Sequence, residues 1–516
     1  MKKITILLFA VAALGSGCKK FTNINNNPNQ PTAVTPNVLL SAALTGSASE
    51  IGTGFFNTPR WMGYWARSGN YIATPPVEDY LIDVGYADGD WQTLYGVLNS
   101  YNNVENAGKA NPTVLSFYIG VAQVMKALHF STLVDAFNNV PYSQAFNLNK
   151  YPTPKYDAAA DIYASLIAQC DSSVAFFDNA KAYYDAGGAT ASIDNQYDIV
   201  FGRNGSVSED TRMDNWVKFA NTVKLRLLLT EQGAVTSSYI TTELAKTTAN
   251  GRGYLMAGTS ASVNPGYSNA QATQLNPFYS EFLNTAGATI GGYNFNVANQ
   301  YAINFYQNTN DERVQTVYTT FSNNTNVGNY DGDPNSASDA DVSGLEVSSQ
   351  YGLLKSPSED QFLISDFESL FMQAEAAQEG YIVGGTAADL GKAAIEQSYV
   401  YLGAPIADAD AFISANAGNT LVDPSTGLKA IITQKWIALN GVNWEQSYTD
   451  FRRTGFPTQD GVNFGVTHAP NPVVHNGKVL IPFRYLYPQS EITTNAGSIP
   501  AGTNAYTPVF WDKREQ

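Results

Sequence analysis

The sequence predicts a mainly α-helical protein, in which a scaffold of stacked helical hairpins carries an irregular, loop-rich lobe with short strands. Apolar residues recur at three- and four-residue spacing through much of 36–250 and 360–455, the periodicity of amphipathic helices. Between these regions, residues 251–359 are dense in Asn, Gly, Ser and Tyr and contain frequent turn signals. The helical pattern fades from Asn443, and we expect 456–516 to be an irregular tail.

Capping residues indicate where several helices begin. Pro112 and Pro154 are suitable first-turn prolines, and Asp214 can cap a further helix. Apolar positions at helical spacing follow each of them, over 115–133, 156–177 and 216–228. Three more helices are expected at 365–380, 387–402 and about 430–440. Within the loop-rich lobe, residues 317–321 resemble a short strand. Successive helices joined by short turns favour stacked hairpins.

The first 17 residues are interpreted as a lipoprotein signal peptide. Two lysines precede an apolar run over 4–14, and Gly15-Ser16-Gly17 supplies the small residues that a signal peptidase accepts. Cys18 follows directly, as in the lipobox of bacterial lipoproteins, where the thiol is acylated. An ordinary secretory signal is the alternative, because Gly15 stands where an aliphatic residue is usual. Two or three acyl chains would anchor the protein firmly, whereas one chain binds only marginally.

The composition limits the classes of molecule that this protein could bind. Residues 18–35 form an Asn- and Pro-rich tether that would connect a single domain, 36–516, to the membrane. No later stretch reaches the roughly 20 apolar residues of a transmembrane helix. The net charge of −16 argues against nucleic acid, since affinity there comes from Lys and Arg on phosphates. Only 14% of residues are charged while Tyr is abundant, which suits a polar, uncharged ligand. Cys170 has no disulfide partner once Cys18 is acylated, so we expect it to be buried.

Seven short segments of the sequence occur in an order that is typical of one protein family. They are Asn25–Thr32, Leu133–Ala145, Trp216–Arg226, Ala374–Ala377, Gln434–Trp436, Asp450–Gly455 and Ile481–Pro488. In this order they resemble the SusD/RagB family of bacterial outer-membrane nutrient-binding lipoproteins, especially its SusD-like branch. The second segment has Asn138-Asn139 where that family usually has Gly-Asp.

The resemblance implies a scaffold of tetratricopeptide-type hairpins with the ligand site on the irregular lobe. It also implies a non-catalytic protein, lipid-anchored at the outer membrane and exposed at the cell surface. Such a protein captures oligosaccharides and passes them to a SusC-like TonB-dependent transporter, without a cofactor. Peptide capture by the same architecture is one alternative. A lipid-anchored glycoside hydrolase is the alternative from a different class.

Catalysis has little support in the residues themselves. His129, His468 and His475 show no metal-site spacing such as His-Glu-x-x-His, and no Gly-x-Ser-x-Gly motif is present. His129 lies between apolar neighbours and is predicted to pack within a helix. Carboxylate pairs for glycoside hydrolysis require a geometry that sequence does not show. We therefore expect no catalytic residues.

Oxygen ligands at alternate positions suggest a structural calcium site. Asp331, Asp333 and Asn335 resemble the first part of an EF-hand loop. Ser336 at the sixth position and Val342 at the twelfth exclude a tight EF-hand. A looser calcium site and an ordinary acidic turn both stay open.

Aromatic residues outside the helical stripes are the candidate ligand-binding residues. The apolar C–H face of a sugar stacks on Trp or Tyr, contributing roughly 1 kcal/mol per ring by analogy with aromatic pairs. The candidates are Trp61, Trp65, Tyr71, Tyr80, Tyr267, Phe278, Tyr279 and Tyr293. The alternative is that these rings pack the long loops onto the helices. Four other tryptophans are predicted to be core residues: Trp91, Trp436, Trp444 and Trp511.

Overall fold

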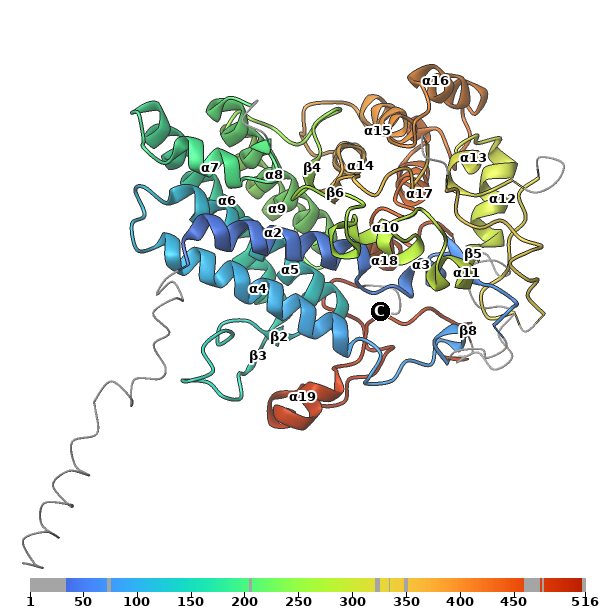
Figure 1. The fold of residues 1–516 in the computed structure, drawn as a ribbon, viewed down its shortest axis with the longest axis horizontal. Helices are drawn as coiled ribbons and strands as arrows, with labels where there is room; N and C mark the ends of the chain where they lie inside the picture. The colour runs from blue at the N-terminus through green and yellow to red at the C-terminus, as the bar shows by residue number, and fades with distance from the viewer. Residues whose placement is uncertain are drawn as a thin grey trace, which may run out of the picture.

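A computed structural model describes residues 34–71, 76–203, 207–320, 325–333, 335–347, 351–458, 474–475 and 478–512. Cys18, the predicted signal peptide and nearly all of the tether lie outside these residues. The described part is mainly helical, and its strands form only two-stranded pairs (Figure 1). The predicted fold class, a helical scaffold with a loop-rich lobe, is confirmed.

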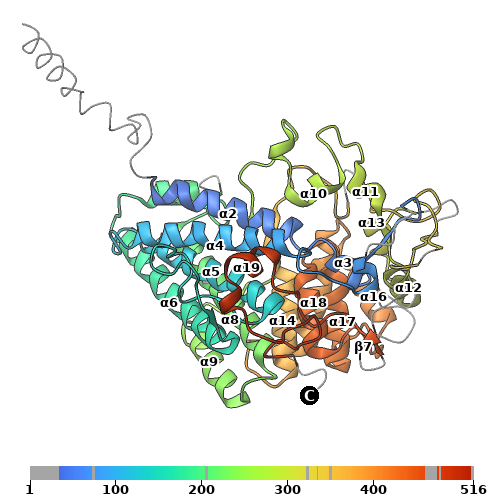
Figure 2. The ribbon, with the colours of Figure 1, turned by 90° about the horizontal axis from the view of Figure 1, so that it is seen from below.

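Long helices build the first half of the scaffold. They are α2 (Pro36–Thr53), α4 (Asp88–Gly108), α5 (Ser116–Phe137), α6 (Ala159–Asp185) and α8 (Glu209–Glu231), with α7 (Ala191–Tyr197) and α9 (Ser237–Ala249) beside them. In this series α2, α4, α5, α6 and α8 each pack on the next (Figures 1 and 2). Helix α5 is long and apolar enough to cross a membrane, but 83% of its most apolar window is buried inside the protein. It is therefore the central core helix.

The second half of the scaffold packs on the first through α8 and α14. Its helices are α14 (Asp366–Gln378), α15 (Ala387–Tyr401), α16 (Ile406–Ala415), α17 (Leu428–Ala438) and α18 (Trp444–Thr454). The hydroxyls of Ser365 and Thr386 accept hydrogen bonds from the first turns of α14 and α15, which explains where these helices begin. The three helices predicted here are confirmed. Helix α18 continues the pattern beyond the predicted fading point, because the Asn443 side chain caps it by accepting from Gln446 N at 3.2 Å.

The loop-rich lobe contains short elements. They are β4 (Ala261–Val263), α10 (Pro277–Phe282), α11 (Gly291–Phe295), β5 (Asn296–Ala298), α12 (Gln300–Thr309) and α13 (Val314–Val317). Strand β4 pairs with β6 (Gln361–Ile364), and β5 pairs with β1 (Trp65–Arg67), which follows α3 (Thr58–Trp61). These antiparallel pairs fasten the lobe to the scaffold.

The remaining elements are short. They are β2 (Val140–Pro141), β3 (Tyr156–Asp157), β7 (Val474–His475), β8 (Lys478–Val479), α19 (Gln489–Thr494) and the 3₁₀ helices Pro76–Asp79, Ala272–Gln274, Pro424–Thr426 and Ala496–Ser498. Strands β2 and β3 pair with each other, as do β7 and β8.

Four local predictions need correction. Pro112 and Pro154 do not lie in the first turn of a helix, because α5 begins at Ser116 and α6 at Ala159. Asp214 does not cap its helix, because Ser208 does so six residues earlier, accepting from Thr211 N at 3.2 Å. Asp214 instead lies 3.4 Å from Arg252 in an ion pair on the helix flank. The predicted strand at 317–321 is also wrong in its described part, since Val317 ends helix α13 and Tyr318 forms only an isolated bridge with Leu345. Local β propensity was overridden by tertiary packing.

The core is continuous from α2 to the C-terminal segment. Trp91, Trp436, Trp444 and Trp511 are all buried, as predicted. Cys170 is buried in α6, and this burial raises the pKa of its thiol, so it acts as a small apolar residue. His129 is fully buried within α5, which confirms its predicted packing role.

Candidate ligand-binding surface

The fold brings together the two aromatic segments that are more than two hundred residues apart in the sequence. Strand β1 pairs antiparallel with β5, with Trp65 opposite Ala298 and Arg67 opposite Asn296. Just beyond this pair, the rings of Tyr71 and Phe295 meet edge to face, with centroids 4.7 Å apart. The short sheet therefore sets the positions of both segments.

Most of the candidate aromatics point inward. Six of the eight are buried: Trp61, Trp65, Tyr80, Tyr267, Phe278 and Tyr279. The Trp65 ring lies 5.5 Å from Phe282 and 5.7 Å from Trp444, and Trp61 stacks on Tyr485 at 5.7 Å. A ring covered by protein on its faces offers none to a sugar, so in this structure the six rings pack loops onto helices.

The accessible rings form a small surface at the edge of the lobe. Tyr71 is 36% exposed, and Phe295 is partly exposed. Tyr293 is partly exposed as well, but its hydroxyl donates to the Leu345 carbonyl at 3.0 Å and so is already engaged. Exposed polar groups surround the pair. We define the Tyr71 surface as Asn70, Tyr71, Asn294, Phe295 and Asp339, of which Asn70 and Asp339 are hydrogen-bonded. Phe295 was not among the predicted residues, and its only sequence signal is its place between two asparagines.

A close backbone approach positions Tyr71. Ser68 N donates to the Phe295 carbonyl at 2.9 Å, and Gly69 N donates to the Ala337 carbonyl at 2.8 Å. A Cβ on Gly69 would lie only 1.9 Å from the Ser336 carbonyl oxygen, so glycine is required there. The turn is closed by Tyr71 N, which donates to the Ser68 carbonyl at 3.1 Å.

Buried charges support this surface from below. The Arg60 guanidinium lies 4.6 Å from the Phe295 ring centroid and donates to the Asn296 side-chain oxygen at 2.6 Å. Arg67 donates through Nε to Glu78 Oε1 at 2.9 Å and through its guanidinium to the Tyr71 carbonyl. Arg67 and Glu78 are both buried. An ion pair inside the lobe thus holds the backbone of the exposed tyrosine.

Asp331 belongs to the same buried group. It is almost fully buried, and neither carboxyl oxygen has a hydrogen-bond partner among the described residues. Burial and the nearby Glu78 raise the pKa of Asp331 well above its ordinary value, so the neutral acid is the favoured form. Burial also raises the pKa of Glu78, although Arg67 and Arg60 act in the opposite direction.

The calcium hypothesis gains no support from this geometry. Asp331 lies near the Glu78 carboxyl group, but Arg60 and Arg67 place positive charges beside both acids, and these oppose a metal ion. Asp333 instead accepts from the backbone N of Asn335 at 2.8 Å, as in an ordinary acidic turn. Within the part of the chain that the structure describes, no group of three or more His, Cys, Asp or Glu side chains could hold a metal ion.

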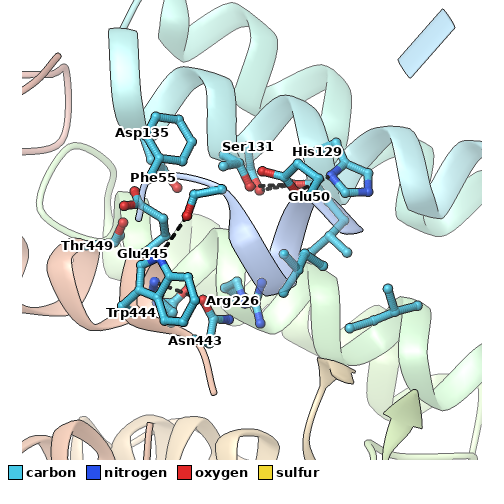
Figure 3. A pocket seen from close by; sticks show the side chains of 16 residues that line it. Glu50, Phe55, His129, Ser131, Asp135, Arg226, Asn443, Trp444, Glu445 and Thr449 are labelled. Atoms are coloured by element: carbon cyan, nitrogen blue, oxygen red, sulfur yellow. Dashed lines mark hydrogen bonds and ion pairs between the residues drawn. The ribbon is translucent and has the colours of Figure 1, made fainter. Parts of the chain in front are cut away.

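Carboxylates with raised pKa values gather elsewhere, around an internal cavity (Figure 3). Burial raises the pKa of Glu445 to about 8 and that of Asp135 to about 6. His129 Nδ1 lies 3.3 Å from Glu50 Oε2 at the same cavity. A raised carboxyl pKa suits a general acid, but the cavity has a volume of only about 40 Å³. It admits a few water molecules and no sugar ring, so it offers no site for glycoside hydrolysis.

Comparisons with known proteins identify relatives of the whole fold. A SusD-like family model, described as starch-binding and associating with the outer membrane, matches residues 28–488. A chitin-binding SusD homologue from Flavobacterium johnsoniae superposes with TM-score 0.71 at 20% identity, covering 92% of this chain and 99% of its own. A SusD-like protein from Bacteroides thetaiotaomicron gives 0.70 at 19% identity, covering 93% and 99%. A further structure, described as a chitin-binding protein, gives 0.70 at 21% identity, covering 93% and 100%. No protein with a curated description matches.

Proposed function

We propose that this chain, which belongs to the SusD-like family, binds neutral oligosaccharides without catalysis and delivers them to a SusC-like TonB-dependent transporter. The family description, starch-binding with association to the outer membrane, supports the ligand class and the location. The two chitin-binding relatives support the same ligand class. In this proposal, acylated Cys18 anchors the protein at the cell surface and the residues that follow act as a spacer.

The Tyr71 surface carries the proposal. The exposed Tyr71 ring offers an apolar face to the C–H face of a sugar, and Phe295 braces that ring from the side. The exposed amides of Asn70 and Asn294 can donate to and accept from sugar hydroxyls, and Asp339 can accept. One stacked ring contributes roughly 1 kcal/mol. A site of this size is therefore weak, and repeated sugar units along a polymer would raise its avidity.

Affinity electrophoresis through soluble polysaccharides tests this site. Wild type, Tyr71→Ala and the matched control Tyr351→Ala are compared in gels containing starch or glycol chitin. Tyr351 is likewise exposed but packs beside Gly403, outside the Tyr71 surface. We expect Tyr71→Ala to weaken retardation about five-fold, the equivalent of ~1 kcal/mol, and the control to match wild type.

Each failure of this experiment has a distinct meaning. Wild type that no neutral polysaccharide retards would contradict the function, and retention on immobilised peptides would then favour peptide capture. Retarded wild type with equally retarded Tyr71→Ala would contradict the site alone. Incubation with the same polysaccharides should release no reducing sugar, because the acids in Figure 3 lie around a cavity too small for a sugar.

A further inference from the structure

A second recess lies on the helical scaffold, away from the Tyr71 surface. It is a cleft of about 660 Å³ between α4, the loop joining β2 to β3, and α19, elements that lie near one another in the lower part of Figure 1. This volume falls within the roughly 300–1,000 Å³ of small-molecule sites. The cleft and the Tyr71 surface share no lining residue.

Aromatic rings form a rigid wall of this cleft. Tyr95 and Phe146 are partly exposed, with ring centroids 6.3 Å apart. Buried Trp91 lies behind Tyr95 at 4.9 Å, and the Tyr95 hydroxyl donates to the Pro141 carbonyl at 2.7 Å, so the ring cannot turn away. Phe146 has a φ of 62°, a left-handed conformation that is rare for a bulky residue and that concentrates at functional sites.

Uncharged polar groups form a further part of the lining, beside apolar residues such as Ala145, Leu148 and Pro154. The amide side chains of Gln92, Asn99, Asn147 and Asn149 line the cleft and are at least partly exposed. Among the described residues that line it, Glu491 is the only charged one, and its Oε2 already accepts from the Tyr156 hydroxyl at 2.8 Å. Without a lining lysine or arginine, an anionic ligand finds no counter-charge. Flat apolar rings beside several amides match a neutral sugar instead.

A glycine in the middle of α4 keeps the cleft open. Glycine destabilises a helix interior relative to alanine, so its presence there needs a reason. Packing does not supply one, because among the described residues no atom outside its chain neighbours and the adjoining helix backbone lies within 4 Å of the position that a Gly96 Cβ would occupy. Gly96 lines the cleft, so a side chain longer than the alanine methyl group would extend into the space between the rings and the amides.

We propose that this cleft is a second binding site for a neutral oligosaccharide, separate from the Tyr71 surface. The sugar face packs on Tyr95 and Phe146, and the amides bind its hydroxyls. Leu148, which is 67% exposed at the rim, covers the bound sugar. This inference rests on the proposed function for its ligand class, and two sites on one body would hold separate parts of one glycan chain.

Calorimetric titration with chitotriose and with maltotriose tests the cleft in the full chain. The variants are Tyr71→Ala, Tyr71→Ala with Gly96→Leu, and Tyr71→Ala with Gly96→Ala as the matched control. We expect Tyr71→Ala to keep residual binding of one trisaccharide. Gly96→Leu should reduce that residual affinity at least ten-fold by filling the cleft, whereas Gly96→Ala should change it less than three-fold. Both substitutions favour the helix, and circular dichroism checks that α4 is retained.

An independent variant guards against an indirect effect of leucine. Asn99→Ala removes a lining amide without adding volume, and we expect it to weaken residual binding about three-fold. Residual binding that is unchanged by both Gly96→Leu and Asn99→Ala would overturn the cleft while leaving the proposed function standing. If wild type bound neither trisaccharide, both the cleft and the proposed function would be overturned. If these two variants instead lost binding to a peptide or a partner protein while sugar binding stayed intact, a sugar site here would also be overturned.

Discussion

The Tyr71 surface and the α4 cleft present similar chemistry on different supports. On the lobe, Tyr71 sits on loops and a short strand pair that stand over buried Arg60, Arg67 and Glu78. On the scaffold, the cleft lies between the long helix α4, the loop joining β2 to β3, and α19, and its Tyr95 ring contacts other rings and one carbonyl. Irregular backbone has few internal hydrogen bonds, so it depends on side-chain charges for order. In a helix the backbone N–H and C=O groups hydrogen-bond to one another. A site on a helix can therefore depend on the shape of its side chains alone.

Removal of the buried cation Arg67 should destabilise the lobe, and we expect this to be the greatest loss of unfolding free energy among the variants. Arg67→Ala leaves Glu78 buried without its partner, which costs about 3–5 kcal/mol of unfolding free energy. Urea denaturation measures this cost. The control Arg252→Ala breaks the more exposed pairs with Asp178 and Asp214 and should cost less than about 1 kcal/mol. Equal costs for the two variants would show that the lobe does not depend on this pair.

The buried acids of the scaffold predict an intermediate effect that depends on pH. Glu445 has a pKa of about 8 in the folded protein, above the value of about 4.3 expected when unfolded. Between these values the native state retains a proton that the unfolded state releases, so its contribution to stability falls as pH rises. The decrease is at most about 1.4 kcal/mol per pH unit and ends above about pH 8.

Glu445→Gln should therefore flatten the fall in unfolding free energy between pH 5 and pH 8. Denaturation at pH 5, 6, 7 and 8 measures the slope in wild type and in the variant. Glu312→Gln, at an exposed position, serves as the control and should leave the slope unchanged. An unaltered slope in Glu445→Gln would contradict the assigned pKa shift. Asp135, whose pKa is about 6, shifts in the same direction and should leave a smaller residual slope.

A small gain in stability is expected from a substitution at the cleft in the helical scaffold. Gly96→Ala should stabilise the protein by about 0.5–1 kcal/mol, because alanine is the better helix former and open space receives its methyl group. The melting temperature measures the gain. Gly46, also within a long helix, has a Val97 methyl group 3.4 Å from the position that a Cβ would occupy, so Gly46→Ala should gain less. A loss of stability in Gly96→Ala would mean that the helix is crowded where the structure shows space.

The helices could be predicted because their signals are local. Apolar spacing and residues such as Ser365 and Thr386 act over one or two turns, so a single sequence contains them. The error at Asp214 is of the same local kind, since two cap residues compete within a few positions and Ser208 provides the cap. Boundaries therefore shifted slightly while the helices themselves were correct.

The site was only partly predictable. Trp65 begins the three-residue strand β1 and Tyr71 lies in the turn after it, yet one ring is buried and the other exposed. Outside regular elements no periodicity indicates which side faces inward. Asp331 resembled a calcium ligand locally, but its environment comes from Arg60 and Arg67, far away in the sequence. The cleft escaped prediction for the same reason, because its walls come from three separated segments.

Neighbouring residues alone specify the helical class, the position of the irregular lobe and the family to which this chain belongs, because periodicity, caps and ordered motifs are local signals. Tertiary structure alone decided which aromatic rings are available to a ligand. That choice depends on pairing between β1 and β5 and on burial of the Arg67–Glu78 ion pair. It also decided that Gly96 faces open space. Long-range contacts set burial, and burial separates a binding ring from a core ring.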